Sequence, residues 1–299
     1  MNTIKCNFSH HYTKHIFRAL GEVKGILNFE IINDETLPKE FIYVNDRLVG
    51  YIAWYDSLKF ASHDILNMKE YDFKIIFKYH YSPNLVDYSI YEKYEHRIVP
   101  CGLWRTWEDE PSYLGWNKNT ILNHKRDIDV MSSMRHHNSG TINLPEEKWP
   151  DWVNVRKYLK IDAPNLLKKK GYNVHTKMID RSKYVNMLRR SNLSYIWSAS
   201  SYLGWKIPEF IQEGVIMITE PLGKDYPLCN DVIIEDGVHA IFCNDPKKFN
   251  DVAISTLKDK SLVKDIRNNC LNLWETKLSR KNVGTWYYNK IMEAYSELS

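Results

Sequence analysis

The sequence has few cysteines and no long apolar run. Its five cysteines are odd in number and far apart, and none belongs to a CxxC pair: Cys6, Cys101, Cys229, Cys243 and Cys270. This pattern argues against a disulfide framework or a structural zinc site and is typical of reduced cytosolic thiols. The longest apolar stretches, such as residues 215–218, are far too short to cross a bilayer. The sequence therefore predicts a cytoplasmic protein with no membrane span.

Charge of one sign is not concentrated either. The net charge is +4 over 299 residues, and no basic stripe demands a nucleic-acid partner. The run Lys168-Lys169-Lys170 is typical of a solvated helix end, with a nucleic-acid contact as the alternative. Hydrophobic residues make up 43% of the chain, as in folded proteins. Because 299 residues exceed what one hydrophobic core usually serves, two domains are expected.

Apolar periodicity predicts strands that alternate with helices. In the first hundred residues we expect a helix at 13–23 and strands at 4–8, 26–32, 41–44, 49–54, 73–77 and 97–101. Further along, we expect strands at 128–132, 173–179, 194–198 and 215–219 and helices at 152–160, 182–190, 208–214, from 245, 261–274 and 283–295. Such alternation favours an α/β fold with parallel sheets covered by helices. The predicted domains are residues 1–105 and 125–299, joined by an irregular linker at 106–124.

The most informative stretch spans residues 201–218. It reads as a turn, a helix that stops at Gly214, and a buried strand. Lys206 just before the predicted helix and Glu209 in its first turn suit a diphosphate and the two hydroxyls of a ribose. The alternative is that Glu209 only complements the helix dipole and Lys206 is solvated.

This stretch resembles the donor-binding half of GT-B glycosyltransferases, of the family 1 and family 4 types. There a basic residue precedes a helix with a ribose-binding glutamate, and a glycine and a buried strand follow. Residues 233–242 resemble the acidic turn of that family, although Ala240 replaces its second glycine, and residues 98–103 resemble the end of its first domain. Ser201 stands where a paired glutamate is usual, which leaves open whether the reaction retains or inverts configuration.

The resemblance implies two Rossmann-like domains that face each other across a cleft, with a small N-terminal domain and a terminal helix that returns to it. It implies a metal-independent enzyme with no cofactor beyond its co-substrate, a nucleotide sugar linked to UDP. The acceptor would be a glycan or another hydroxylated molecule, or a hydroxymethylated DNA base as in some viral members. The implied donor-binding residues are Lys206 and Glu209. Arg135, in the first loop of the second domain, is a further donor-binding candidate, with a solvated loop arginine as the alternative. Lys78 is another, which either approaches the donor phosphates or only caps a sheet.

A glycosyl transfer also needs a base for the acceptor hydroxyl. Asp56 follows an apolar strand of the first domain and is the preferred candidate, although a turn residue is the alternative. His10 and His11 follow the first predicted strand and are the other catalytic candidates. His63, Asp64 and His80 are weaker ones.

Two further readings stay open at this stage. Asp127 and Asp129 match a metal-binding D-x-D pattern, but they lie at the start of a predicted strand rather than at its end, so no metal site is expected. A different class of function is a non-catalytic nucleic-acid-binding or carbohydrate-binding α/β protein.

Overall fold

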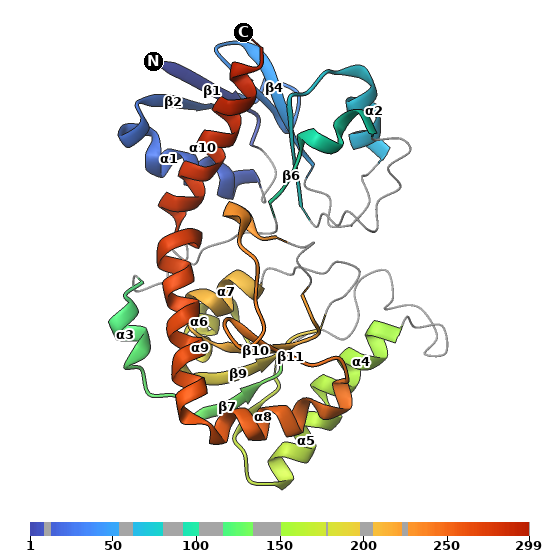
Figure 1. The fold of residues 1–299 in the computed structure, drawn as a ribbon, viewed down its shortest axis with the longest axis vertical. Coiled ribbons are helices and arrows are strands. Elements are labelled where there is room, and N and C mark those ends of the chain that lie inside the picture. Colours follow the sequence, from blue (N-terminus) through green and yellow to red (C-terminus); the bar gives the residue numbers. More distant parts are fainter. Residues whose placement is uncertain are drawn as a thin grey trace. The chain divides into compact units, whose positions relative to one another are not determined.

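The chain forms two compact α/β units in the computed structural model (Figure 1). The structure describes residues 1–8, 13–53, 62–79, 92–101, 116–133, 151–177, 179–197, 206–222 and 227–298. Unit 1 consists of Met1–Thr106, Lys224–Ile233 and Glu275–Ser299, and unit 2 of Trp107–Gly223 and Ile234–Trp274. The chain therefore contributes three separate segments to unit 1.

Unit 1 contains a six-stranded sheet in the order β2-β1-β3-β4-β5-β6. Its strands are β1 (Asn2–Cys6), β2 (Phe29–Asn33), β3 (Phe41–Val44), β4 (Arg47–Ala53), β5 (Ile75–Lys78) and β6 (Ile98–Pro100). β3 is antiparallel to both of its neighbours, and the other pairs are parallel. Asn45 and Asp46 join β3 to β4 with φ of 49° and 64°, the left-handed conformation of a tight hairpin. The predicted paired strands at this point are confirmed.

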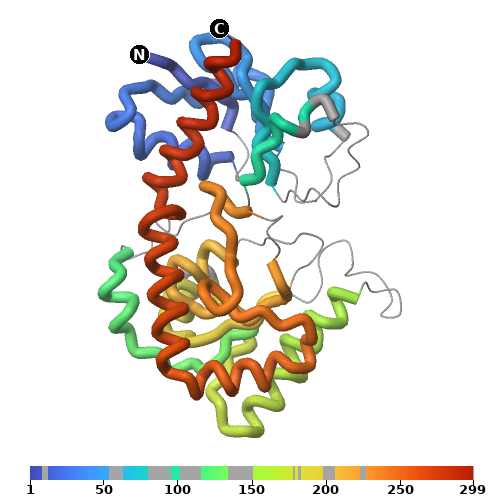
Figure 2. The backbone as a smooth tube through the Cα atoms, in the orientation of Figure 1, coloured from blue at the N-terminus to red at the C-terminus, as the bar shows by residue number. Residues whose placement is uncertain are grey.

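The helices of unit 1 are α1 (Thr13–Leu27), α2 (Ser62–Glu70) and α10 (Arg280–Ser296), with short 3₁₀ turns at Glu92–Arg97 and Cys229–Asp231. Figure 2 shows α10 running along α1, and Gly284 lies at their closest approach. The far C-terminal helix thus completes the core formed by the first hundred residues.

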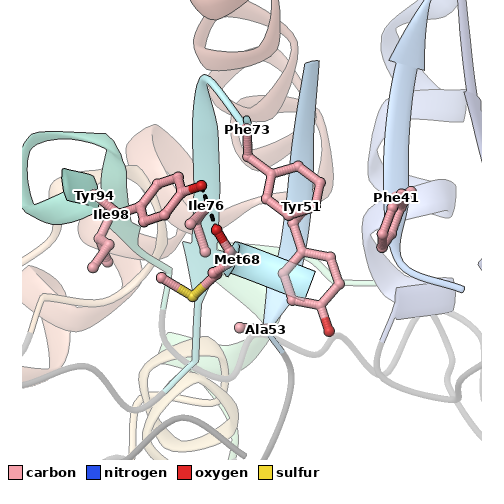
Figure 3. Packing of buried hydrophobic residues seen from close by; sticks show 8 residues of the cluster. All are labelled: Phe41, Tyr51, Ala53, Met68, Phe73, Ile76, Tyr94 and Ile98. Atoms are coloured by element: carbon pink, nitrogen blue, oxygen red, sulfur yellow. Dashed lines mark hydrogen bonds between the residues drawn. The ribbon is translucent and has the colours of Figure 1, made fainter. Parts of the chain in front are cut away.

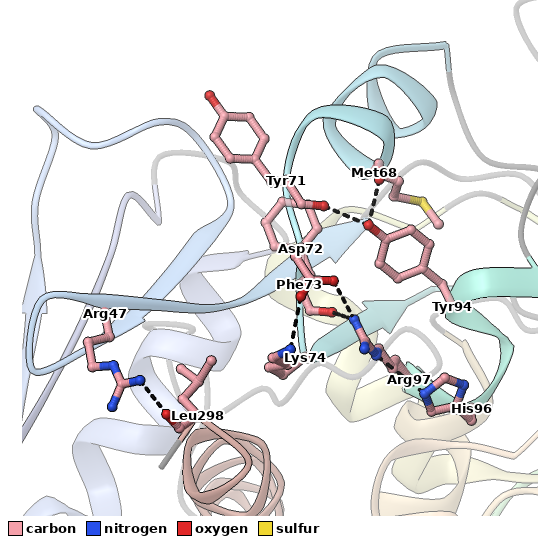
Figure 4. Close-up of polar contacts among 10 residues, drawn as sticks. All are labelled: Arg47, Met68, Tyr71, Asp72, Phe73, Lys74, Tyr94, His96, Arg97 and Leu298. Carbon is pink, nitrogen blue, oxygen red and sulfur yellow. Dashed lines mark hydrogen bonds and ion pairs between the residues drawn. The ribbon is translucent and has the colours of Figure 1, made fainter.

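A hydrophobic cluster rich in aromatic rings packs against the unit 1 sheet (Figure 3). Phe41 meets both Tyr51 and Phe73 edge to face, with ring centroids 5.5 and 5.1 Å apart, a favourable geometry for aromatic pairs. The Tyr94 hydroxyl donates to the carbonyls of Met68 and Tyr71 at 2.5 and 2.6 Å (Figure 4). These bonds tie the 3₁₀ turn before β6 to the end of α2.

Unit 2 contains a five-stranded sheet in the order β11-β10-β9-β7-β8, with every pair parallel. Its strands are β7 (Ile128–Met131), β8 (Val174–His175), β9 (Ser191–Tyr195), β10 (Ile216–Thr219) and β11 (Ala240–Phe242). Its helices are α3 (Lys118–Leu122), α4 (Asp151–Lys160), α5 (Asp162–Lys169), α6 (Arg181–Arg190), α7 (Lys206–Gln212), α8 (Phe249–Lys258) and α9 (Lys260–Leu273), with a 3₁₀ turn at Pro246–Lys248. A π-helical turn at Trp274–Leu278 follows α9.

β10 is buried along its whole length, as expected for a central parallel strand covered on both faces. With the alternating strands and helices of both units, this arrangement confirms the predicted α/β class with two Rossmann-like domains. The predicted domain boundaries stay a prediction. Within the described ranges, no helix combines the length and apolar character needed to span a bilayer.

Several predicted boundaries were wrong. α1 continues to Leu27, and Asn28 with φ of 54° ends it, so β2 starts later than the expected residue 26. β9 starts directly after α6, and β8 has only two residues. α7 begins at Lys206 rather than Pro208, because a proline without an N–H group is tolerated inside the first turn of a helix.

Candidate functional site

The carboxyl edge of the parallel sheet in unit 2 gathers the polar side chains that fit a ligand. β7, β9 and β10 are adjacent in this sheet and end at Met131, Tyr195 and Thr219. In open α/β sheets ligands bind outside the carboxyl ends of the strands. The residues just after these three strands are therefore the first place to look for a site.

Lys206 lies at this edge. Its Nζ donates a hydrogen bond to the carbonyl of Ser133, just after β7, at 3.1 Å. The Ser133 side chain is only 5% exposed, and its hydroxyl has no hydrogen-bond partner among the described residues. A buried hydroxyl without a partner is uncommon in proteins. The Lys206 ammonium group and the Ser133 hydroxyl thus place two hydrogen-bond donors at the end of β7.

Glu209 lies three residues further along α7 and is 5% exposed. Tyr184, from α6, is buried nearby: burial first, and then the negative charge of Glu209, raise the pKa of the Tyr184 hydroxyl. A buried carboxylate needs such donors because removing its charge from water is costly.

Arg156 is a polar residue at this edge that the sequence analysis missed. Its Nε and one terminal nitrogen donate to the carbonyl of Trp197, after β9, at 2.8 and 2.6 Å. Burial lowers the pKa of Arg156 to about 10, and the nearby charge of Glu220, after β10, opposes this shift. The available signal was its spacing: Arg156 follows Val153 and precedes Leu159 by three residues each, on the buried face of α4.

The opposite, amino edge of the same sheet holds a buried ion network. Arg189 donates to the Glu213 carboxylate at 2.7 Å, and Arg126 donates to the Glu213 carbonyl at 2.7 Å and to the Leu188 carbonyl at 3.3 Å. These carbonyls are at or just beyond the ends of α6 and α7, where a cation is favourable. Burial raises the pKa of Glu213 and lowers that of Arg126 to about 9. This network is structural and remote from the carboxyl edge of the sheet.

Other predicted site residues are distributed differently. Asp56, His10, His11, Arg135 and His80 lie outside the residues that the structure describes. Lys78 is the last residue of β5 in unit 1 and is fully buried. Burial raises the pKa of the Cys101 thiol, and the positive charge of Lys78 acts in the opposite direction.

Asp64 and His63 begin α2 in unit 1. The Tyr51 hydroxyl donates to the buried Asp64 carboxylate at 2.7 Å, and His63 Nε2 lies 3.4 Å from the same oxygen. Burial, followed by the charge of Asp64 and this hydrogen bond, raises the pKa of Tyr51. Asp64 thus anchors α2 to β4, and the half-exposed His63 lies beside it.

Asp127 and Asp129 have separate structural contacts. Asp127 accepts from Arg190 Nε at 2.8 Å, and Asp129 accepts from the Asn173 backbone N–H at 2.8 Å. Among the described residues, no group of three or more His, Cys, Asp or Glu side chains is arranged to hold a metal ion. The D-x-D pattern therefore connects β7 to its neighbours.

The acidic turn before β11 is a compact backbone feature. Gly237 has φ of 70°, and Asp236 accepts a hydrogen bond from the Phe242 N–H at 2.7 Å. Ala240, which replaces the second glycine of the resembled pattern, begins β11 and pairs with Met217. The alanine is accommodated because it lies in a regular strand.

No family model and no curated protein matches the sequence. Three solved structures with a similar chain path are HepE (Alr3699) of Anabaena in complex with UDP and glucose, TarM of S. aureus in complex with UDP, and sucrose-phosphate synthase of Thermosynechococcus elongatus. Their identities are 8%, 11% and 12%, with TM-scores of 0.49, 0.46 and 0.45. The matches cover 81%, 78% and 82% of this chain and 71%, 47% and 68% of theirs. The chain thus spans about half the length of TarM, and such distant matches assign it no activity.

Proposed function

We propose that this chain is a metal-independent glycosyltransferase of the GT-B type that takes its sugar from a UDP-linked donor. The observation that carries the proposal is that one short helix, α7, carries both Lys206, which reaches the carbonyl just after β7, and the buried Glu209. Glu209 would accept hydrogen bonds from the two ribose hydroxyls, since a carboxylate offers about four acceptor positions. The contact with Tyr184 is compatible with that role.

The departing diphosphate would be stabilised by cations at the same edge. Lys206 and Ser133 meet at the end of β7, and the Arg156 guanidinium lies at the end of the adjacent strand β9. Fixed donors aimed at developing negative charge lower the barrier to transfer. Arg135 and Lys78 stay proposed donor-binding residues.

In the transfer itself, the acceptor oxygen attacks the anomeric carbon as the bond from that carbon to the diphosphate oxygen breaks. A base removes the acceptor proton, and Asp56, with His10 and His11 as the other candidates, is the proposed base. The acceptor class we propose is a glycan or another hydroxylated molecule, including a hydroxymethylated DNA base. The five cysteines are free thiols, which supports a reducing compartment, and we place the protein in the cytoplasm.

Calorimetric titration of UDP and UDP-glucose into the protein tests the donor site. Glu209→Ala should weaken binding by about 1–3 kcal/mol, or roughly 5- to 150-fold in Kd, because it removes a charged hydrogen-bond partner. Glu22→Ala, on the exposed side of α1, is the matched control and should bind like the wild type. Equal affinities of the two variants, with unchanged melting temperatures, would contradict the site.

Tyr184→Phe tests how Glu209 is held. It removes one hydroxyl, so UDP affinity should fall less than in Glu209→Ala, and the preference for UDP over 2′-deoxy-UDP should shrink. A purely structural tyrosine would change the melting temperature without changing that preference. Metal independence is tested by turnover in EDTA; activity that is lost in EDTA and restored by manganese would overturn it.

A further inference from the structure

The fold gathers basic side chains that are scattered in the sequence. We call the following set the basic edge: Lys125, Lys168, Lys169, Lys170, Lys177 and Arg190. These residues lie before β7, at the end of α5 and in the turn after it, just after β8, and at the end of α6. β8 is the last strand of its sheet and pairs with β7 alone. Because β7, β8 and β9 are parallel, the positions before them lie at the amino edge of the sheet, and Lys177 lies two residues beyond the two-residue β8.

Hydrogen bonds link the segments that carry this set. Arg190 binds Asp127, two residues after Lys125, and Asn173, three residues after Lys170, donates its side-chain N–H to the Asp127 carbonyl at 2.5 Å. Asn173 also donates its backbone N–H to Asp129. Asp127 and Asp129 are thus both engaged in local contacts, Asp127 with Arg190 of the basic edge itself.

The positive charge of this set also acts on His175. Burial lowers the pKa of His175, and the charges of Lys168, Lys177 and Arg190 lower it further, against a hydrogen bond with the Lys177 carbonyl that acts in the opposite direction. Three cations from three different segments therefore lie close enough to act on one imidazole. The edge is a cluster in space and not only a lysine run.

An apolar side chain stands among these lysines. Leu166, on α5, is 46% exposed and precedes Lys169 and Lys170 by three and four residues, so all three share one side of the helical turn. Ile161, at the start of α5, is 41% exposed. The one acidic residue of this helix, Asp162, lies at its other end.

A cationic surface can bind a nucleic acid or an anionic membrane, and the exposed leucine distinguishes them. A nucleic-acid backbone offers sugar and phosphate, which give Leu166 nothing to bury against. A bilayer offers phosphate at its surface and hydrocarbon just beneath, so that lysines and an apolar side chain are satisfied together. We propose that the basic edge docks unit 2 on a membrane surface rich in anionic lipid, with Leu166 in the headgroup region.

This docking does not depend on glycosyl transfer, because none of the observations behind it involves Lys206 or Glu209. Each basic side chain near an anionic leaflet contributes about fivefold to partitioning. Reversing the charge of Lys168, Lys169 and Lys170 should therefore reduce binding by about 100-fold or more. The attraction should also weaken with added salt, since the Debye length falls to about 3 Å at 1 M.

Co-sedimentation of the full chain with phosphatidylcholine vesicles, with and without phosphatidylserine, tests the proposal. We expect binding only to the phosphatidylserine vesicles, its loss in Lys168→Glu/Lys169→Glu/Lys170→Glu, and a weaker binding in Leu166→Ser. The matched control is Lys258→Glu/Lys260→Glu/Lys264→Glu, which makes the same charge change at exposed positions of α8 and α9 and should still bind. Equal melting temperatures would show that both triple variants are folded.

Three results would overturn the proposal. The first is equal binding to vesicles with and without phosphatidylserine, and the second is equal binding by the two triple variants. The third is a wild-type protein that fails to bind the anionic vesicles but retains a duplex oligonucleotide through the same three lysines, which would assign the edge to nucleic acid.

Discussion

Replacing Gly284 by alanine should destabilise unit 1, although alanine is the better helix former. Gly284 lies in α10 where that helix crosses α1. A Cβ atom at this position would lie 2.0 Å from the carbonyl oxygen of Ala19, 2.6 Å from its carbonyl carbon and 3.3 Å from Val23 Cγ2. The first two atoms belong to the backbone and cannot rotate away. The two helices must therefore move apart by about 1 Å or more to restore ordinary contact.

The magnitude follows from two opposing contributions. Alanine in place of glycine within a helix gains about 1 kcal/mol, whereas overpacking a well-filled interior costs about 1–3 kcal/mol and sometimes more. Because the clash is with backbone, and because separating the helices also loosens the buried Val283, Trp286 and Tyr287, we expect a net loss of about 2 kcal/mol. At about 2–4 °C per kcal/mol for a unit of this size, the melting temperature should fall by about 4–8 °C.

Thermal melts followed by circular dichroism measure this effect. Gly25→Ala in α1 is the matched control, because a Cβ there meets nothing within 4 Å, and it should raise stability by about 1 kcal/mol. The same chemical change thus has opposite signs at two helical positions. A Gly284→Ala protein that melts at or above the wild-type temperature would refute the close approach of α1 and α10.

Three further predictions concern the other polar groups. Tyr51→Phe leaves the buried Asp64 with one donor fewer and should lower the free energy of unfolding by about 1–3 kcal/mol; an unchanged urea midpoint would mean that other donors suffice. Burial depresses the pKa of His239, so its contribution to stability is present above an unfolded pKa of about 6.5 and is lost as the pH falls through the folded value. Melting temperatures should thus fall on acidification, and less so in His239→Gln. Asp56→Asn should reduce turnover by about 10²–10⁴-fold with unchanged donor Kd; normal turnover would transfer the role of base to one of the two histidines after β1.

Local sequence chemistry predicted much of the fold. Strand and helix alternation predicted the two α/β units, and Asn45-Asp46 predicted the β3–β4 hairpin, because a two-residue turn with positive φ favours these residue types. Boundaries failed where neighbouring elements decide them. β8, for example, has only two residues, because its extent is set by its pairing with β7 and not by its own apolar pattern.

The polar site was only partly accessible from the sequence. Lys206 and Glu209 stood out because they lie together in one segment. Arg156 did not, since its importance comes from the Trp197 carbonyl after a strand forty residues later. The basic edge has the same origin: its members are separated by up to 65 positions along the chain, between Lys125 and Arg190, and only the strand pairing brings them together.

Two buried glutamates, Glu209 in α7 and Glu213 just after it, provide a last test because they differ in position and in partner. Glu213 lies at the amino edge of the sheet and binds a cation, Arg189, at 2.7 Å, whereas Glu209 lies beside the phenol of Tyr184. Breaking a buried ion pair leaves an uncompensated charge and costs about 3–5 kcal/mol. Glu213→Gln should therefore lower the melting temperature strongly and leave UDP affinity unchanged. Glu209→Gln should lower the melting temperature less and should raise the Kd for UDP by about fivefold or more. If Glu213→Gln weakened UDP binding in a protein of normal stability, the donor site would belong at the amino edge and the assignment of Glu209 would be wrong.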